Sequence, residues 1–523
     1  MLQTVGIEKL GLILLAVAGF AAWILYRMLQ NCVWHPLARF PGPRIAAISP
    51  LYRAYIDCVA QSSFVHTLEK LHAKYGDIVR VGPNELHFAN PSAYLEIFNS
   101  NNRWDKEESV YHSFGEDRSS FGFLTYKEAK ERKDVLTKMF SKKAIADVQG
   151  LIVEKVVDLC KSFERRGNEP VDLFYAFRCM SMDVITYLCF GNSVNAINAP
   201  NHEAPIILAM EASLPVFVCF KHSSLYKGMI MNCPPRISKI VSPATAGLVD
   251  LQQLLKKQIS ELTSNPENLK KLPHSTTIYH ELLRPEAYRS GTAPSSESLY
   301  EEAQALLFGG ADTTGTTLMH GTFYILSLPE IYRKLKEELL RAWPDLEKQP
   351  GLSELEKMPY LVALSVYFSF SGGEFELTVL PDCRHQRIAS SKSWRCISAA
   401  ESCACTRGDY FADIHPGRNR STNEQPFRPP QSGHIREPRR FQSGEMARRK
   451  REGSRQVASR VLARASKLSR LAWAELYICF AHVFRKFDIE LDPSSPEKLV
   501  WRDCFLPEYR GPHLKARLRK CLV

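Results

Sequence analysis

The residues best suited to chemistry lie in one long apolar stretch, Tyr300 to Leu328. It is interrupted by Gly309-Gly310-Ala311-Asp312-Thr313-Thr314. Two glycines in a helix interior cost about 1 kcal/mol each, and Asp and Thr are poor helix formers. A buried helix should carry them where something approaches its backbone closely. A carboxyl beside a hydroxyl in apolar surroundings is also what proton delivery to a buried acceptor requires. The alternative is a kinked core helix whose Thr hydroxyls bond back to carbonyls.

The elements that must position this stretch are mostly helices. Strand signals on either side of a Gly-Pro-Asn turn predict a hairpin over Ile78 to Phe88. Apolar periodicity predicts further helices at Ser63–Tyr75, Ala144–Phe163, Leu173–Phe190 and Leu248–Leu262. Many helices with one small sheet near the start predict an α-rich α+β domain.

The amino-terminal run Leu10 to Leu29 is apolar except for Arg27 and nearly spans a bilayer as a helix. A cleaved signal peptide is the alternative, but no small-x-small cleavage site follows the run. Arg39 and Arg44 also follow it, which favours a single-pass anchor with the body on the cytosolic side. The segment Pro41-Gly42-Pro43 predicts a stiff hinge between anchor and body.

The basic character of the chain is local. The 523 residues carry a net charge of +12. Between Arg436 and Arg470 there are twelve Lys and Arg against three Glu, so +9 of that charge sits in 35 residues. The remaining chain is close to neutral, which argues against a nucleic-acid-binding surface on the folded body. Fourteen Cys without regular spacing favour a reducing compartment over a disulfide framework.

With these motifs in place, the chain resembles the cytochrome P450 family, of the microsomal type found in fungal secondary metabolism. The resemblance rests on the central G-G-A-D-T-T helix, the anchor with its Pro-Gly-Pro hinge, and the hairpin YGDIVRVGPNELHF. It also rests on Glu131-Arg132-Lys133 ahead of Met139-Phe140-Ser141, and on Leu355 to Tyr360. It covers about 1–361 and 471–523.

The resemblance implies a role for each matching residue. Asp312 and Thr313 would relay protons, and Gly309, Gly310 and Ala311 would form the oxygen groove over a haem. Arg132 would pair with a haem propionate. It further implies electrons from NADPH through NADPH-cytochrome P450 reductase, a location on the endoplasmic reticulum membrane and a lipophilic small-molecule substrate. The apolar side chains of Leu306, Leu307 and Phe308 fit an apolar substrate pocket.

From Val362 the sequence changes character. No Glu-x-x-Arg follows Pro359-Tyr360-Leu361 in the family's context, and no F-x-x-G-x-R-x-C-x-G motif occurs. None of the Cys beyond this point has Gly-x-Arg before it; these are Cys383, Cys396, Cys403, Cys405, Cys479, Cys504 and Cys521. The cysteine whose thiolate would bind the haem iron is therefore unknown. A basic insertion that binds nucleic acid is an alternative, but it would displace the family motifs rather than remove them.

The degeneracy of the genetic code favours a reading-frame error as the reason why these family motifs are missing. In a frame shifted by one base, Cys383 to Lys392 can encode V-A-I-K-E-S-L-R-L-S, which contains Glu-x-x-Arg. Phe441 to Met446 can encode F-N-P-E-R-W, and Arg464 to Arg470 can encode G-x-R-S-C-L-G. Val362 to about Asp382 then resembles a translated intron, and the frame returns at Leu471, about two residues early.

These interpretations define the expected organisation. Residues 1–30 form the membrane anchor, 31–361 and 471–523 form two parts of a P450-like catalytic domain, and 362–470 form a non-native, disordered segment in the C-terminal third. The expected function is a haem-thiolate monooxygenase that inserts one oxygen atom of O2 into a lipophilic molecule. The alternative is a haem-free, membrane-tethered remnant.

Overall fold

A computed structural model of the chain describes residues 2–98, 104–264, 277–370, 412–413 and 469–521. The chain divides into two compact units. The smaller unit holds residues 1–55, 66–102 and 410–458, and the larger holds 56–65, 103–409 and 459–523. Most of the expected 362–470 segment lies outside the described residues.

The smaller unit is built around the expected hairpin. Strands β1 (Ile78–Gly82) and β2 (Glu85–Phe88) pair antiparallel with Ile78 opposite Phe88, and β4 (Ala412–Asp413) adds to the other edge of β2. The Pro-Gly-Pro hinge packs on β1, because the Arg80 amide donates to the Pro41 carbonyl at 2.8 Å. A Cβ at Gly42 would lie 2.2 Å from the Arg80 carbonyl oxygen, so this close approach requires glycine. The unit's helical elements are α1 (Leu2–Leu29), η1 (Gln30–Trp34), α2 (Arg44–Ile48), α3 (Leu51–Ala54), α4 (Phe64–Tyr75) and α5 (Pro91–Ile97), with η2 (Tyr55–Val59) at the boundary.

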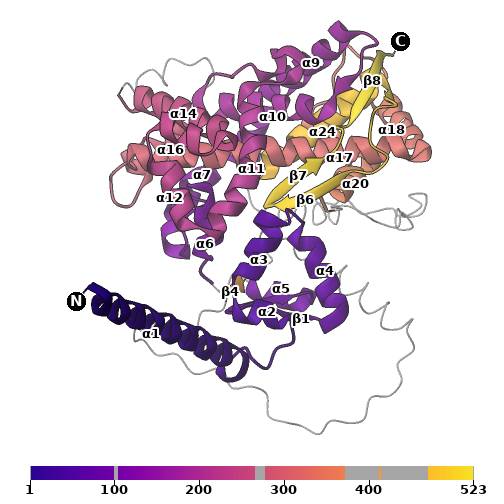
Figure 1. Ribbon diagram of the computed structural model, residues 1–523. Coiled ribbons are helices and arrows are strands. Elements are labelled where there is room, and N and C mark those ends of the chain that lie inside the picture. The colour runs from indigo at the N-terminus through magenta and orange to yellow at the C-terminus, as the bar shows by residue number, and fades with distance from the viewer. Residues whose placement is uncertain (1, 99–103, 265–276, 371–411, 414–468, 522–523) are drawn as a thin grey trace. The chain divides into compact units, whose positions relative to one another are not determined.

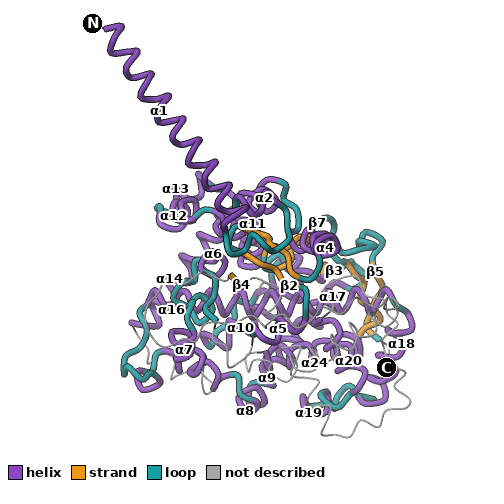
Figure 2. Tube along the Cα trace, turned by 90° about the horizontal axis from the view of Figure 1, so that it is seen from below, coloured by secondary structure: helices purple, strands orange, loops and turns teal. Residues whose placement is uncertain are grey.

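The larger unit is predominantly helical (Figure 1, Figure 2). Its first half contains α6 (Glu108–Tyr111), η3 (His112–Phe114), α7 (Tyr126–Met139), α8 (Lys142–Asp147), α9 (Gln149–Arg166), β3 (Val171–Asp172), α10 (Leu173–Phe190), η4 (Ala196–Asn198), η5 (Pro200–His202), α11 (Pro205–His222), α12 (Ser224–Asn232), α13 (Pro235–Val241), η6 (Pro243–Thr245) and α14 (Ala246–Ser264). Its second half contains α15 (Ile278–Leu282), η8 (Pro285–Ala287), α16 (Ser296–Leu307), η9 (Phe308–Asp312), α17 (Thr313–Ser327), α18 (Pro329–Ala342), α19 (Leu352–Leu355), α20 (Pro359–Phe370), α24 (Ser469–Lys486), β5 (Phe487–Leu491), β6 (Val500–Cys504), β7 (Leu506–Arg510) and β8 (Lys515–Lys520).

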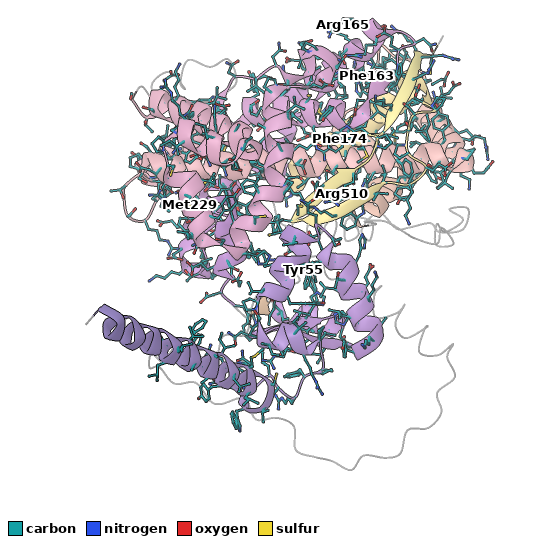
Figure 3. All side chains as sticks on the ribbon, in the orientation of Figure 1. Tyr55, Phe163, Arg165, Phe174, Met229 and Arg510 are labelled. Carbon is teal, nitrogen blue, oxygen red and sulfur yellow. The ribbon has the colours of Figure 1, made fainter. Side chains whose placement is uncertain are left out.

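The core of the larger unit forms where α10 packs along α17 and η9, with α24 packed against α9, α17, α18 and α20. Helix α10 is mostly apolar, and about half of the core side chains come from α9, α10, α11, α17 and α24. The carboxy-terminal strands close this unit in two small sheets, one in the order β3-β8-β5 and the other formed by β6 and β7. Phe174 of α10, labelled in Figure 3, packs on Tyr509 of β7 with the ring centroids 5.6 Å apart. The carboxy-terminal strands thus help to fix α10.

Three helices are long and apolar enough to cross a membrane, among the described residues. Leu173–Phe190 is 89% buried within the fold, so it is a core helix. The window Leu14–Trp34 has none of its residues buried. It is therefore a candidate membrane span, as the sequence predicts.

Most of the expected elements are confirmed. The central helix, the hairpin, α4, α10 and α14 lie within a few residues of their expected positions. The prediction of one helix over Ala144–Phe163 is wrong, because Val148 separates α8 from α9 with φ −97° and ψ 3°. Helix α20 continues past the expected break at Val362 to Phe370.

Candidate functional site

The central helix runs without interruption through its chemical motif. Helix α16 leads into η9, and η9 into α17, and Figure 1 shows α16 and α17 in line. The five residues Phe308–Asp312 form a π-helical turn. Such turns are rare, and they are frequent at functional sites. The helix-breaking residues are thus accommodated by a widened turn, and the helix continues.

One stripe of this helix is accessible while the rest is buried. Ala305, Gly309, Thr313 and Thr317 are half-buried or exposed, at a spacing of four residues that places them on one face. Gly309 is exposed although Phe308 is 6% exposed and Ala311 is fully buried. We call these four residues the accessible stripe. A flat group can approach the backbone here because all four side chains are small.

The two glycines of the motif have different surroundings. A Cβ at Gly309 would meet no atom within 4 Å, so open space lies beside it. A Cβ at Gly310 would lie 2.7 Å from Cγ1 of Ile185 on α10. Gly309 therefore belongs to the accessible stripe, whereas Gly310 allows α10 and the central helix to pack closely. Ala311, with 0% exposure, is also a packing residue.

The Asp312 carboxyl is held by a buried arginine. Arg178 of α10 donates from Nε to Asp312 Oδ1 at 2.7 Å and from a terminal nitrogen to Thr316 Oγ1 at 2.7 Å. Arg178 is 3% exposed, and its guanidinium lies 3.7 Å from the centroid of the Phe174 ring. Asp312 is 7% exposed, and its second oxygen, Oδ2, has no hydrogen-bond partner among the described residues. A buried carboxylate oxygen without a partner is costly, so this atom is suited to hold a water molecule or a transferable proton.

Thr313 lies next to Asp312 and on the accessible stripe. Its hydroxyl donates back to the Gly309 carbonyl at 2.7 Å. This is the bond that the kinked-core alternative predicts. It also orients the hydroxyl oxygen so that its lone pairs can still accept a hydrogen bond. The acid and the alcohol are therefore adjacent, and the alcohol faces the open side.

Arg132 has an internal partner. From α7 it donates to Glu302 Oε2 and to Ser298 Oγ of α16, both at 2.8 Å, and it is 5% exposed. Glu302, which is fully buried, also accepts from the Ser120 amide at 2.8 Å. This network ties α7 and the loop before it to the central helix. These two bonds use two of the five N–H donors of the guanidinium, and the propionate contact stays a prediction.

Sequence reasoning missed Arg178 and Glu302, the partners of Asp312 and Arg132. A signal was present in both cases. Arg178 is a lone arginine inside an apolar helix, and Glu302 is one of two adjacent glutamates in the middle of α16. A charge in a buried helix needs a partner of opposite sign. Only the fold identifies which partner it has.

Comparison with known proteins places the chain in a family. The family model described as Cytochrome P450 matches residues 52–364. Cytochrome P450 monooxygenase tpcC of Cochliobolus heterostrophus is 29% identical over 352 residues, covering 66% of this chain and 66% of that protein. Cytochrome P450 monooxygenase flvC of Aspergillus flavus is 25% identical over 540 residues, covering 96% of this chain and 95% of that protein. The crystal structure of the cytochrome P450DA heme domain shares the fold, with a TM-score of 0.60 and 14% identity over 92% of this chain and 98% of that chain.

The chain belongs to the cytochrome P450 family of monooxygenases. The α-rich, P450-like fold expected from the sequence is confirmed. The family match ends at residue 364, close to the expected break at Val362. The relatives are named as monooxygenases, and they give no support to the haem-free alternative.

The family implies a haem, and the described residues fit one side of it. The accessible stripe, with open space at Gly309, offers a flat approach to the central helix. The cysteine ligand of the haem iron, in contrast, is not found among the described residues. None of the cysteines among the described residues follows Gly-x-Arg, the context of the family's ligand loop. Burial also raises the pKa of the Cys160 and Cys179 thiols to about 12, so these remain protonated.

The described residues therefore fit the face of the ring, and none of their cysteines stands in the Gly-x-Arg context of the family's iron ligand. The expected position of the ligand, under Leu468 and Ser469 in the shifted frame, lies at the edge of the described residues, because α24 begins at Ser469. Four further cysteines, Cys383, Cys396, Cys403 and Cys405, lie outside them.

Proposed function

We propose that the gene encodes a haem-thiolate monooxygenase that inserts one oxygen atom of O2 into a lipophilic small molecule of secondary metabolism. The observation that carries the proposal is the pairing of Thr313, on the accessible stripe, with the buried carboxyl of Asp312. A haem bound through a thiolate supplies oxygen activation in this family. In the chain as written, no cysteine among the described residues stands in the Gly-x-Arg context of that thiolate.

In this proposal Asp312 and Thr313 handle protons. Arg178 holds the carboxyl through Oδ1 and leaves Oδ2 without a partner. A water molecule at Oδ2 would connect Asp312 to the exterior, and the Thr313 hydroxyl would pass the proton to the open side of the helix. Gly309 keeps that side free of side chains. Gly310 and Ala311 act through packing.

The missing ligand is explained, in the same proposal, by the frame error. The native protein would have residues 31–361 joined through a corrected segment to 471–523 as one catalytic domain. The break in the family match near residue 364 supports this, as does the ordered helix α24 that begins at Ser469. The corrected segment would restore Glu-x-x-Arg and the cysteine loop ahead of α24.

The cellular setting follows from the anchor and the family. Residues 1–30 would hold the protein in the endoplasmic reticulum membrane with the body in the cytosol. NADPH-cytochrome P450 reductase would supply electrons. The apolar Leu306, Leu307 and Phe308 favour a lipophilic substrate, and a terpenoid, polyketide or alkaloid is the class we propose. No nucleic-acid partner is proposed.

The reduced carbon monoxide difference spectrum tests the proposal. Two full-length proteins are compared, the chain as written and the chain translated from the corrected frame. We expect a thiolate-type Soret band from the corrected chain and none from the chain as written. The control is the corrected chain with its loop cysteine replaced by serine, which should lose the band and keep its helical circular dichroism. A strong thiolate band from the chain as written would refute the missing ligand, and no band from the corrected chain would refute the function.

A further inference from the structure

A lysine and a cysteine from distant parts of the chain meet at one end of the carboxy-terminal strands. Lys336 lies in α18, and Cys521 directly follows β8. The Lys336 ammonium donates a hydrogen bond to the cysteine sulfur, with Nζ 3.1 Å from Sγ. The lysine side chain is 14% exposed and the cysteine is half-buried. A small molecule can therefore reach the sulfur from solvent.

Both side chains are held in place by their surroundings. Lys336 Nζ also donates to the Phe487 carbonyl at 2.8 Å and lies 2.7 Å from Asp488 Oδ1. The three N–H bonds of the ammonium are therefore used by a carbonyl, a carboxylate and the sulfur. The Cys521 amide donates to the Lys486 carbonyl at 2.9 Å, which continues the pairing of β8 with β5. The proximity of the lysine and the cysteine is thus built into the fold.

This geometry prepares a bond between nitrogen and sulfur. Reacting atoms about 3–3.5 Å apart are in a near-attack arrangement, and Nζ and Sγ lie 3.1 Å apart. When the N–H that points at the sulfur loses its proton, the lone pair of the amine points at the sulfur in its place. An oxidised sulfur is the matching electrophile, because a sulfenic acid condenses with a nitrogen to a sulfenamide.

We propose that Cys521 and Lys336 form a reversible sulfur–nitrogen cross-link when the protein meets hydrogen peroxide. The Cys521 thiol attacks one peroxide oxygen, the O–O bond breaks, and a sulfenic acid and water are formed. The Lys336 ammonium gives one proton to water, and its nitrogen attacks the sulfenic sulfur. An S–N bond forms, the S–O bond breaks, and hydroxide leaves as water with a second proton of the nitrogen. The thiol and the amine are oxidised by two electrons to a sulfenamide, and one peroxide is reduced to two water molecules. A dithiol restores both side chains.

The amine must lose a proton before it attacks, so the second step depends on pH. Burial lowers the pKa of the Lys336 ammonium. The hydrogen bond to Asp488, the nearby Tyr332 and the Cys521 sulfur outweigh burial, and the pKa is raised overall. At about pH 7 the lysine is therefore almost entirely ammonium. We expect the linked fraction of oxidised Cys521 to be larger at about pH 9 than at about pH 7.

The cross-link would fasten the carboxy-terminal sheet to α18. Cys521 follows β8, and β8 is the central strand of the sheet β3-β8-β5. The start of α10 is tied to the same part of the chain, because the Leu173 amide donates to the Leu514 carbonyl at 2.9 Å. A covalent tie at Cys521 would stop β8 from fraying at its end. We expect slower amide hydrogen exchange in β5 and β8 of the oxidised protein.

The test uses the reduced full-length chain in detergent and does not depend on haem. The chain is treated with hydrogen peroxide, the remaining thiols are alkylated, and a tryptic digest is analysed by mass spectrometry. We expect residues 335–341, uncleaved after Lys336, to be joined to residues 521–523 with the loss of two hydrogen atoms. Dithiothreitol should separate the two peptides.

Two variants define the partners of the link. Lys336→Arg keeps a cation that can make the same hydrogen bonds but has no nucleophilic amine. In this variant Cys521 should accumulate as sulfenic acid, which dimedone traps. Cys233→Ser, which removes another half-exposed thiol, is the matched control and should still form the link.

Two results would overturn the proposal. One is Cys521 that is oxidised to sulfenic or sulfinic acid without any linked peptide at either pH. The other is a link at Cys521 that forms equally well in Lys336→Arg, because the amine would then not be the partner. Because neither result involves haem, the cross-link can fail while the monooxygenase proposal stands, and the reverse also holds.

Discussion

Glu475 lies in α24 at 1% exposure, and burial raises the pKa of its carboxyl from 4.5 to about 8. The nearby Ser181 side chain opposes that shift only in part, and Glu475 Oε2 has no partner among the described residues. At about 1.4 kcal/mol per pH unit, the difference corresponds to roughly 5 kcal/mol between the protonated and ionised forms. The carboxyl is therefore mostly neutral in the folded protein at pH 7.

The sign of the effect on stability follows from proton linkage. Below the unfolded-state pKa of 4.5 the carboxyl is protonated in both states, and its full contribution to stability is present. As the pH rises towards 8, the unfolded chain releases the proton while the folded chain keeps it, so stability falls. Between about pH 5.5 and about pH 8.5 this one group should lower the free energy of unfolding by about 3 kcal/mol.

Glu475→Gln removes the ionisation and keeps the shape of the side chain. The free energy of unfolding is measured by urea denaturation of the full-length chain in detergent, followed by tryptophan fluorescence. Between these two pH values, it should fall by about 3 kcal/mol more in the wild type than in the variant. Glu490→Gln, at a side chain that is 66% exposed on β5, is the matched control and should keep the wild-type pH dependence. Parallel pH profiles for wild type and Glu475→Gln would refute the reasoning.

Two further predictions concern the central helix. Gly310→Ala should destabilise the protein by about 1–3 kcal/mol, since its Cβ would lie 2.7 Å from Ile185 Cγ1. Gly309→Ala, with no atom within 4 Å, should instead stabilise the helix by up to about 1 kcal/mol. Equal urea midpoints for the two variants would contradict this assignment. Arg178→Met should cost about 3–5 kcal/mol because it leaves the buried Asp312 carboxylate unpaired. Adding Asp312→Asn should recover part of that loss in the same assay, and no recovery would argue against the ion pair.

The features that could be predicted from sequence are those with a local pattern. The hairpin at Ile78 to Phe88 follows from its turn residues, and α10 and α14 follow from apolar periodicity. The motif around Asp312 was identified because glycine and Asp-Thr-Thr do not suit an ordinary buried helix. The π-helical turn gives the physical reason that the helix nevertheless continues.

The features that could not be predicted depend on contacts between distant residues. Arg178 and Asp312 are 134 residues apart, and Arg132 and Glu302 are 170 residues apart. No local pattern specifies which buried arginine meets which buried carboxylate. The role of Gly310 has the same origin, because its neighbour Ile185 belongs to another helix. The family resemblance assigned both glycines to one oxygen groove, whereas the packing of α10 separates their surroundings.

The central claim is that the catalytic groove of a cytochrome P450 is present and that its iron ligand is lost through a frame error. Sequencing the spliced transcript across the codons for residues 362–470 tests it most directly. We predict a transcript without the bases for Val362 to about Asp382, read in the frame that encodes Glu-x-x-Arg, F-N-P-E-R-W and G-x-R-S-C-L-G before Leu471. A transcript that encodes residues 362–470 as written would contradict the claim.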